Sequence, residues 1–330
     1  MKRTSRRIAI SLLLAIVVVH CATRPRPGEP APRAGDEIVV CGERFHIGTP
    51  VVLWTDPGGY DAYRVEPRFA DAMDERARAE WKPEAHYDSM RRHVPLAEQA
   101  RFRGDGMRVA DLARYVDLFV VHYDVCGTSR RCFQVLQDER HLSVHFLLDV
   151  DGTIYQTLDL KERAWHASVA NDRSIGIEIA QVGAYPRPDH EALRQWYARD
   201  ERGPFVVFDQ ERDALGIRTP NFVARPARPA LLTGAIHGTP LWQYDFTSEQ
   251  YEALAKLTAA LHRILPRISL NAPRDAKGAI LMRSLSPDEF ATYSGVLGHF
   301  HITEAKSDPG PAFDWGRVLA TAAKTASSGD

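Results

Sequence analysis

Hydrophobic and polar residues alternate with two different periods along the chain, and each period predicts a different element. Residues 115–123 are nearly all apolar, as expected for a central strand that is buried on both faces. Shorter apolar stretches predict further strands at 143–149, 153–157 and 174–180. Asp151 and Gly152 supply the turn of a hairpin between the first two of these strands.

A helical period appears later in the chain. Apolar residues recur at helical spacing from Tyr251 to Leu265, just before Pro266. Thr247 and Gln250 precede this run with the spacing of a capping box, which predicts where the helix begins. Because strands and helices alternate without a regular βαβ repeat, the sequence predicts an α/β fold with a central mixed β-sheet flanked by helices.

The rest of the chain is divided by composition. Residues 36–112 predict a short strand pair and a helical stretch at 69–81, but no chemistry can be assigned to them, so they are interpreted as an N-terminal extension of unknown role. The predicted main domain covers 113–322, with a tail at 323–330. Two stretches inside this domain are interpreted as insertions, at 184–236 and 268–294.

The N-terminus has the pattern of an exported protein. Basic residues precede an apolar run at 8–19 that is too short to span a bilayer, which predicts a signal peptide at 1–21 followed by a Pro-rich linker at 22–35. Cys21 ends the apolar run, as in a bacterial lipoprotein signal, although His20 stands where a small residue is usual. Because no aspartate follows Cys21, we expect a lipoprotein of the outer membrane that faces the periplasm.

Overall composition adds limits on partners. The chain has 330 residues, of which 44% are hydrophobic and 26% charged, as in ordinary globular proteins. Lys and Arg total 42 against 43 Asp and Glu, so no basic field favours nucleic acid as a partner. A membrane contact is expected only through the N-terminal lipid, and no pattern sets the oligomeric state.

Export also permits disulfide bonds. Cys126 and Cys132 lie close together in the sequence and are the favoured pair, which leaves Cys41 without a partner. No Cys-x-x-Cys spacing indicates a zinc knuckle.

Three places carry residues suited to metal-assisted hydrolysis. They are His122 at the end of the first predicted strand, Glu178 inside the fourth, and the stretch 298–310 with His299 and Asp308. Two imidazoles and a carboxylate would hold Zn²⁺ with one open position and one net positive charge. Each residue also has a plain structural interpretation. Asp308 precedes Pro-Gly and suits a turn, a single histidine at a strand end is more often structural, and the alternation of the fourth strand allows Glu178 to face solvent.

Together these elements resemble the N-acetylmuramoyl-L-alanine amidases that share the peptidoglycan-recognition-protein fold, the amidase_2 group. The resemblance covers about 200 residues in the order of that family, and it is interrupted by the two insertions. The matching segments are Val120-Val-His-Tyr123, residues 141–156, Ala164-Trp-His-Ala-Ser168, Ser174-Ile-Gly-Ile-Glu178, Gly298-His299 and Lys306-Ser-Asp-Pro-Gly-Pro-Ala-Phe-Asp-Trp315.

The resemblance implies one zinc ion, held by His122, His299 and Asp308, with His301 as a weaker alternative to His299. The other roles that it implies follow the same matched segments: Glu178 for the carboxylate that activates the attacking water, Lys306 for stabilisation of the substrate oxygen, and His166 for a contact at the substrate groove. Some branches place a catalytic tyrosine at the position of Val144, so the resemblance indicates the branch that relies on glutamate.

The implied reaction is zinc-dependent hydrolysis of the amide bond between N-acetylmuramic acid, or its anhydro form, and L-alanine. Its substrates would be intact peptidoglycan of the cell wall or released muropeptides. Two alternatives belong to other classes: an envelope protein that binds peptidoglycan without catalysis, and a structural lipoprotein that keeps only the amidase fold. The complete set of ligands, with Glu178 and Lys306, favours the enzyme.

Overall fold

The computed structural model describes residues 26–208 and 212–327. The predicted signal peptide and Cys21 lie outside the described residues, so that prediction is not addressed by the fold. Among the helices of the described ranges, none combines the length and apolar character that crossing a membrane would require.

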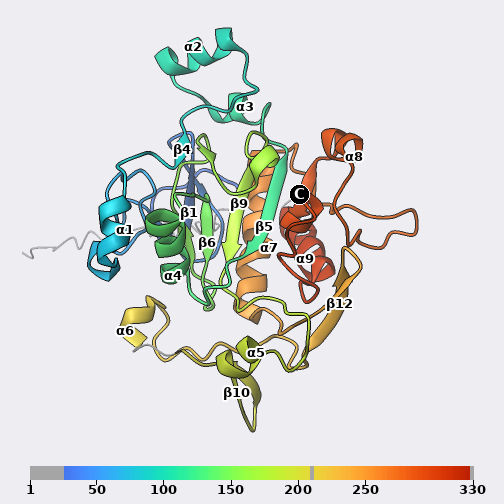
Figure 1. The fold of residues 1–330 in the computed structure, drawn as a ribbon. Coiled ribbons are helices and arrows are strands. Elements are labelled where there is room, and N and C mark those ends of the chain that lie inside the picture. Colours follow the sequence, from blue (N-terminus) through green and yellow to red (C-terminus); the bar gives the residue numbers. More distant parts are fainter. Residues whose placement is uncertain (1–25, 209–211, 328–330) are drawn as a thin grey trace, which may run out of the picture.

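A six-stranded mixed sheet forms the centre of the molecule (Figure 1). Only β6 and β7 pair in antiparallel fashion, and the other neighbours are parallel. In spatial order the strands are β14 (Gly295–Gly298), β5 (Leu118–Tyr123), β9 (Ser174–Ile179), β6 (Phe146–Leu148), β7 (Ile154–Gln156) and β3 (Val51–Leu53). The predicted α/β fold with a central mixed sheet is therefore confirmed, and the predicted strands are present in shortened form.

Alternation along β9 explains how the sheet acquires one fully apolar face. Ile175, Ile177 and Ile179 all join the main hydrophobic core, whose other side is supplied by α7 (Ser248–Ile264) and α9 (Trp315–Ser327). Helix α7 lies along the sheet in Figure 1 and begins at the predicted capping box of Thr247 and Gln250. Burying each such aliphatic side chain contributes roughly 1.5–3 kcal/mol, so this face supplies much of the stability of the sheet.

The opposite face of the sheet is covered by α4 (Ser129–Gln134), which continues into a π-helical turn at Val135–Glu139. Phe133 and Leu136 of this segment pack with Leu147 and Tyr155 of the sheet. The even-numbered residues of β9 lie on this second face, among them Glu178.

The N-terminal extension is built into the fold. Strand β3 forms the edge of the main sheet, and β4 (Tyr87–Asp88) pairs with β8 (Arg163–Ala164). The predicted strand pair is present as the hairpin of β1 (Glu37–Val40) and β2 (Glu43–His46). The helical stretch expected at 69–81 divides into a 3₁₀ turn, Ala70–Ala72, and α1 (Glu75–Glu80). Helices α2 (Leu96–Asp105) and α3 (Val109–Leu112) complete the segment. The boundary at 112/113 stays a prediction.

The predicted insertions form small elements at the periphery. The first one lies near the carboxyl ends of β5 and β9, with α5, β10 and α6 at the bottom of Figure 1. Its elements are α5 (Glu191–Trp196), β10 (Tyr197–Asp200), β11 (Gly203–Val206), α6 (Arg212–Leu215) and β12 (Leu232–Ile236), which pairs with β13 (Thr239–Gln243). The second insertion contains α8 (Pro287–Thr292). Outside the two insertions, the chain forms two 3₁₀ turns, at Ser168–Ala170 and His299–His301.

Candidate active site and metal centre

The two predicted histidine ligands meet because their strands are parallel neighbours. His122 is the fifth residue of β5, and His299 directly follows β14, whose last residue, Gly298, lies opposite Val121. Parallel strands end at the same edge of a sheet, so both imidazoles project at that edge. Asp308 returns to the same place, because its carbonyl accepts a hydrogen bond from the amide of Phe300.

Three donor atoms converge there. The Nδ1 atoms of His122 and His299 lie 3.0 Å apart, and Oδ2 of Asp308 lies 2.9 Å from the first and 3.1 Å from the second. All three side chains are buried, and within the described residues they form a group able to hold a metal ion.

The donor set fits a single divalent cation such as zinc. At this spacing the two imidazole nitrogens and the carboxylate oxygen can all direct lone pairs at one cation, whereas without a cation one Nδ1–H can donate to a neighbouring acceptor instead. The spacing also suits a cation whose bonds to nitrogen and oxygen are about 2.0–2.2 Å. Burial and the neighbouring His299 lower the pKa of His122 to about 4, so this imidazole is neutral, as a ligand must be.

Glu178 lies beside this group on the adjacent strand. It stands opposite His122 in the β5–β9 register, and its Oε1 is 4.0 Å from Nδ1 of His122. Oε2 is buried and has no hydrogen-bond partner within the described residues. Burial, followed by the charges of Asp308 and Asp124, raises the pKa of Glu178 well above its ordinary value. The alternation thus correctly placed Glu178 on the face opposite the isoleucines, but its carboxyl group is mostly buried beside the donor group and is not solvated.

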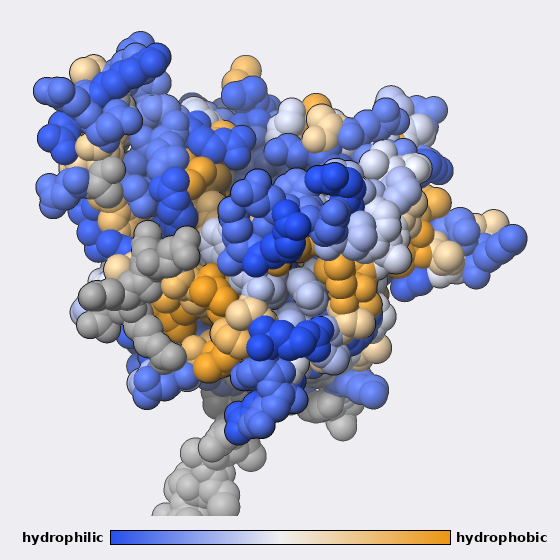
Figure 2. Space-filling view, turned by 60° about the horizontal axis from the view of Figure 1, so that its bottom comes forward, coloured by the Kyte–Doolittle hydropathy of each residue, from blue (hydrophilic) through white to orange (hydrophobic). Residues whose placement is uncertain are grey.

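A cavity of about 260 Å³ surrounds these groups. Lys306 lines it together with Glu178 and the three donors, and so does His166. A larger cavity of about 690 Å³ shares Val125, Cys126 and Val135 with it, and its other wall comes from the first insertion. Figure 2 brings this end of the molecule forward and shows hydrophobic residues gathered among hydrophilic ones. The two cavities therefore adjoin each other at these shared residues.

The structure differs from the predicted disulfide. The three cysteines of the described chain, Cys41, Cys126 and Cys132, are free thiols. The Sγ atom of Cys126 donates to the carbonyl of Asp124 at 3.1 Å, which holds the thiol in a local turn. Both Cys126 and Cys132 line the 260 Å³ cavity.

The two remaining histidines of the motifs have distinct places. His166, expected at the substrate groove, lines the cavity, but its Nδ1 also lies 3.0 Å from Nε2 of His122. His301 is fully occupied elsewhere: its Nδ1 accepts from the amide of Gly298 and its Nε2 donates to the carbonyl of Leu281. His301 is thus not brought into the donor group.

Some residues of the site gave no sequence signal. The Oδ1 atom of Asp124 accepts from the amides of Cys126, Gly127 and Gln181, which fixes the loop after His122. Burial raises the pKa of this carboxyl to about 7. Asp124 follows directly on the strand motif, but nothing in its spacing distinguishes it from an ordinary turn residue.

Comparison with known families agrees with this site. Residues 112–200 match the sequence profile of the Amidase_2 family, described as N-acetylmuramoyl-L-alanine amidase. The matched part includes His122, His166 and Glu178, whereas His299 and Asp308 lie beyond it. Residues 112–200 are therefore similar to the N-acetylmuramoyl-L-alanine amidase family.

Solved structures give weaker likenesses. A selenomethionine derivative of AmpD is 21% identical, with 73% of this chain and 92% of that chain covered and a TM-score of 0.33. The N-acetylmuramyl-L-alanine amidase AmiD from E. coli, in complex with an anhydro-N-acetylmuramic acid peptide, is 18% identical over 62% of this chain and 57% of that chain, also at 0.33. The endolysin N-acetylmuramoyl-L-alanine amidase LysCS from Clostridium intestinale is 14% identical. The match covers 63% of this chain and 84% of that chain, with a TM-score of 0.33. The search of curated proteins finds no match.

Proposed function

We propose that this protein is a zinc-dependent amidase that hydrolyses the bond between the lactyl group of N-acetylmuramic acid, or its anhydro form, and L-alanine. The observation that carries the proposal is the convergence of His122, His299 and Asp308 within 2.9–3.1 Å, with a buried carboxyl group beside them. The match to the amidase family supplies the reaction class. A protein that only binds peptidoglycan would need neither the donor triangle nor Glu178.

Zinc held by Nδ1 of His122, Nδ1 of His299 and Oδ2 of Asp308 would supply Lewis-acid polarisation and a water of lowered pKa. The remaining work falls to side chains of the chain. Asp308 would offset part of the cation's charge through its ionised carboxylate.

Glu178 is the proton carrier in this proposal. Its Oε2 is free of other hydrogen bonds within the described chain and lies in the same cavity as the donors, so it can accept a proton from the attacking water. The same oxygen then delivers that proton to the departing amide nitrogen, which balances the reaction. Burial raises the pKa of Glu178 well above its ordinary value, which favours the first half of this transfer, the uptake of the proton from water.

Lys306 lines the cavity and, with Arg140, brings positive charge to it. Its ammonium group would stabilise negative charge on the substrate carbonyl oxygen as water adds. Substrates are muropeptides or peptidoglycan strands, since the adjoining 690 Å³ cavity leaves room beyond the scissile bond.

The proposal is tested with the purified protein and defined muropeptides, with and without a chelator. Mass spectrometry should detect free stem peptide beginning at L-alanine, and chelation should abolish its release until zinc is restored. His299→Ala should lose both zinc and cleavage, whereas Glu178→Gln should lose cleavage and keep zinc. Stoichiometric zinc without cleavage of any muropeptide would contradict the enzymatic proposal.

We place the enzyme in the periplasm, anchored to the outer membrane through Cys21. The basic and apolar pattern before Cys21 supports this location. Cys21→Ala should move the protein from the membrane fraction to the soluble periplasmic fraction, as measured by fractionation and immunoblotting. Equal membrane association of the variant would contradict lipid anchoring.

A further inference from the structure

His166 lies directly behind the first ligand. Its Nδ1 is 3.0 Å from Nε2 of His122, and the two ring planes are nearly perpendicular, at 87°. The opposite nitrogen of His122, Nδ1, belongs to the donor triangle and must direct a lone pair at the cation. The proton of a neutral His122 is then on Nε2, where the acceptor is His166.

The second nitrogen of His166 continues this arrangement. Its Nε2 lies 3.2 Å from Oγ of Ser174, at the start of β9. With Nδ1 of His166 accepting from His122, the proton of His166 is on Nε2 and is donated to the Ser174 hydroxyl. One chain of hydrogen bonds therefore determines the tautomer of both imidazoles.

Gly176 provides the space that this arrangement needs. A Cβ atom at residue 176 would lie 2.5 Å from both Cε1 and Nδ1 of His166, closer than any side-chain contact allows. The backbone of Gly176 is an ordinary strand, paired with Val120, so its conformation does not require glycine. The ring of His166 is what requires it.

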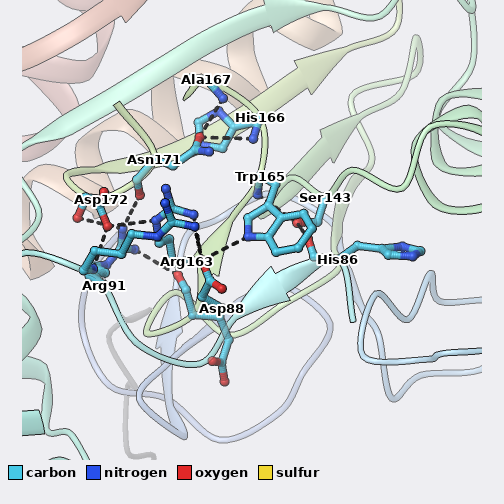
Figure 3. Close-up of polar contacts among 12 residues, drawn as sticks. His86, Asp88, Arg91, Ser143, Arg163, Trp165, His166, Ala167, Asn171 and Asp172 are labelled. Atoms are coloured by element: carbon cyan, nitrogen blue, oxygen red, sulfur yellow. Dashed lines mark hydrogen bonds and ion pairs between the residues drawn. The ribbon is translucent and has the colours of Figure 1, made fainter. Parts of the chain in front are cut away.

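The N-terminal extension fixes the loop that carries His166 (Figure 3). Oδ1 of Asn171 accepts from the amides of His166 and Ala167, and the guanidinium of Arg91 donates to the carbonyl of Asn171 at 2.9 Å. On the other side, the carboxylate of Asp88 accepts from Nε1 of Trp165 at 3.2 Å. Both ends of the Trp-His-Ala segment are thus tied to residues 88–91.

We propose that His166 is a positioning residue that holds His122 in the tautomer and orientation required for metal binding through Nδ1, and that Gly176 is kept small for this purpose. The inference rests on the proposed metal site. The N-terminal extension then contributes indirectly to metal binding, because Asp88 and Arg91 hold the loop in which His166 lies. Loss of a partner that orients a ligating histidine typically weakens metal affinity by about 10–100-fold.

Zinc affinity of the metal-free protein, measured by competition with a chromophoric chelator, tests this inference without reference to activity. His166→Leu should weaken zinc binding by about 10–100-fold, because the acceptor for Nε2 of His122 is lost. His166→Asn places an amide oxygen near the position of Nδ1 and should stay within about tenfold of the wild type. Gly176→Ala should behave like His166→Leu although His166 itself is unchanged.

Gly316→Ala is the matched control for the glycine substitution. A Cβ at residue 316 meets only Oδ1 of Asp314 at 3.5 Å, an ordinary contact, so zinc affinity should not change. Urea unfolding of each metal-free variant, measured in parallel, separates metal affinity from stability of the fold.

Equal zinc affinity of the wild type, His166→Leu and Gly176→Ala would overturn the inference and leave the proposed function intact. Equal weakening by His166→Leu and His166→Asn, with matching losses of metal-free stability, would also overturn it, since a purely structural role predicts that result. A wild-type protein that takes up no zinc would overturn both proposals together.

Discussion

The two faces of the six-residue strand β9 have different roles, one in stability and one in the candidate site. On one face, Ile175, Ile177 and Ile179 are buried in the main core against α7 and α9. On the other, Gly176 leaves room for an imidazole ring, and Glu178 holds a buried oxygen without a partner among the described residues. The first face stabilises the fold through apolar burial, whereas the second carries groups whose burial costs free energy. Changes on the two faces should therefore separate stability from function.

The largest effect is expected at Glu178. Glu178→Gln preserves the size of the side chain but removes the proton acceptor, so the turnover number should fall by about 10²–10⁴-fold. Zinc affinity and the free energy of unfolding should change little, because Oε2 has no partner to lose within the described chain. The comparison uses muropeptide cleavage, metal content and urea unfolding of one preparation. A variant with near-normal turnover and bound zinc would remove Glu178 from the mechanism.

The opposite pattern is expected on the apolar face. Ile177→Ala leaves a cavity in the main core and should reduce the free energy of unfolding by about 2–5 kcal/mol. The site lies on the other face, so zinc affinity of the molecules that remain folded should stay close to that of the wild type. Urea unfolding and chelator competition measure the two quantities. Loss of zinc affinity without loss of stability would show that the two faces are not independent.

A buried carboxyl group outside the site sharpens the comparison with Glu178. Burial raises the pKa of Glu162 to about 7, above its ordinary 4.5, while Tyr63 donates to its Oε1 at 3.1 Å. The folded state binds this proton more tightly than the unfolded state does. The resulting stabilisation is fully present below pH 4.5 and is lost as the pH rises to about 7. The loss amounts to about 3 kcal/mol at most.

Glu162→Gln keeps the acceptor for Tyr63 and removes the titration. Urea unfolding at pH 5 and pH 8 should show a smaller decline for the variant than for the wild type. Identical declines in the two proteins would mean that the pKa of Glu162 is not raised in the folded state.

The smallest effect is expected at Ser174, which is one step farther from the metal than His166. Ser174→Ala removes the acceptor for Nε2 of His166 but leaves the contact between His166 and His122 in place. Zinc affinity should fall by less than about tenfold, below the effect of His166→Leu. Chelator competition on both variants shows which of the two substitutions weakens zinc binding more. A larger loss at Ser174 than at His166 would contradict the proposed direction of the hydrogen bonds.

Regular patterns made much of the fold predictable. The alternation in 174–180 located the strand and its buried face, and the capping box of Thr247 and Gln250 located the start of α7. The sheet edge was not predictable, because β3 is a three-residue strand whose pairing with β7 depends on contacts about a hundred residues apart. Short strands of this kind leave no period that can be recognised.

The site was predictable only in part. His122 and His299 are 177 residues apart in sequence, so no local pattern shows that they meet, and their pairing followed from a resemblance of motifs. The supporting residues could not be predicted at all. Arg91 and Arg92 are neighbours of the same type, yet the first is completely buried and the side chain of the second is 70% exposed. Only the tertiary contacts distinguish them.

The burial of Arg91 has a practical consequence for dissecting the protein. Its guanidinium donates to the carbonyls of Leu160, Glu162, Asn171, Asp172 and Ser174, all within the segment matched by the amidase family. An expression fragment that begins at residue 113 would leave these oxygens without their donor, at a cost of about 1–3 kcal/mol for each one that stays buried. Marginal domains do not tolerate losses of that size. The smallest fragment expected to fold therefore begins well upstream of the family match, before Asp88.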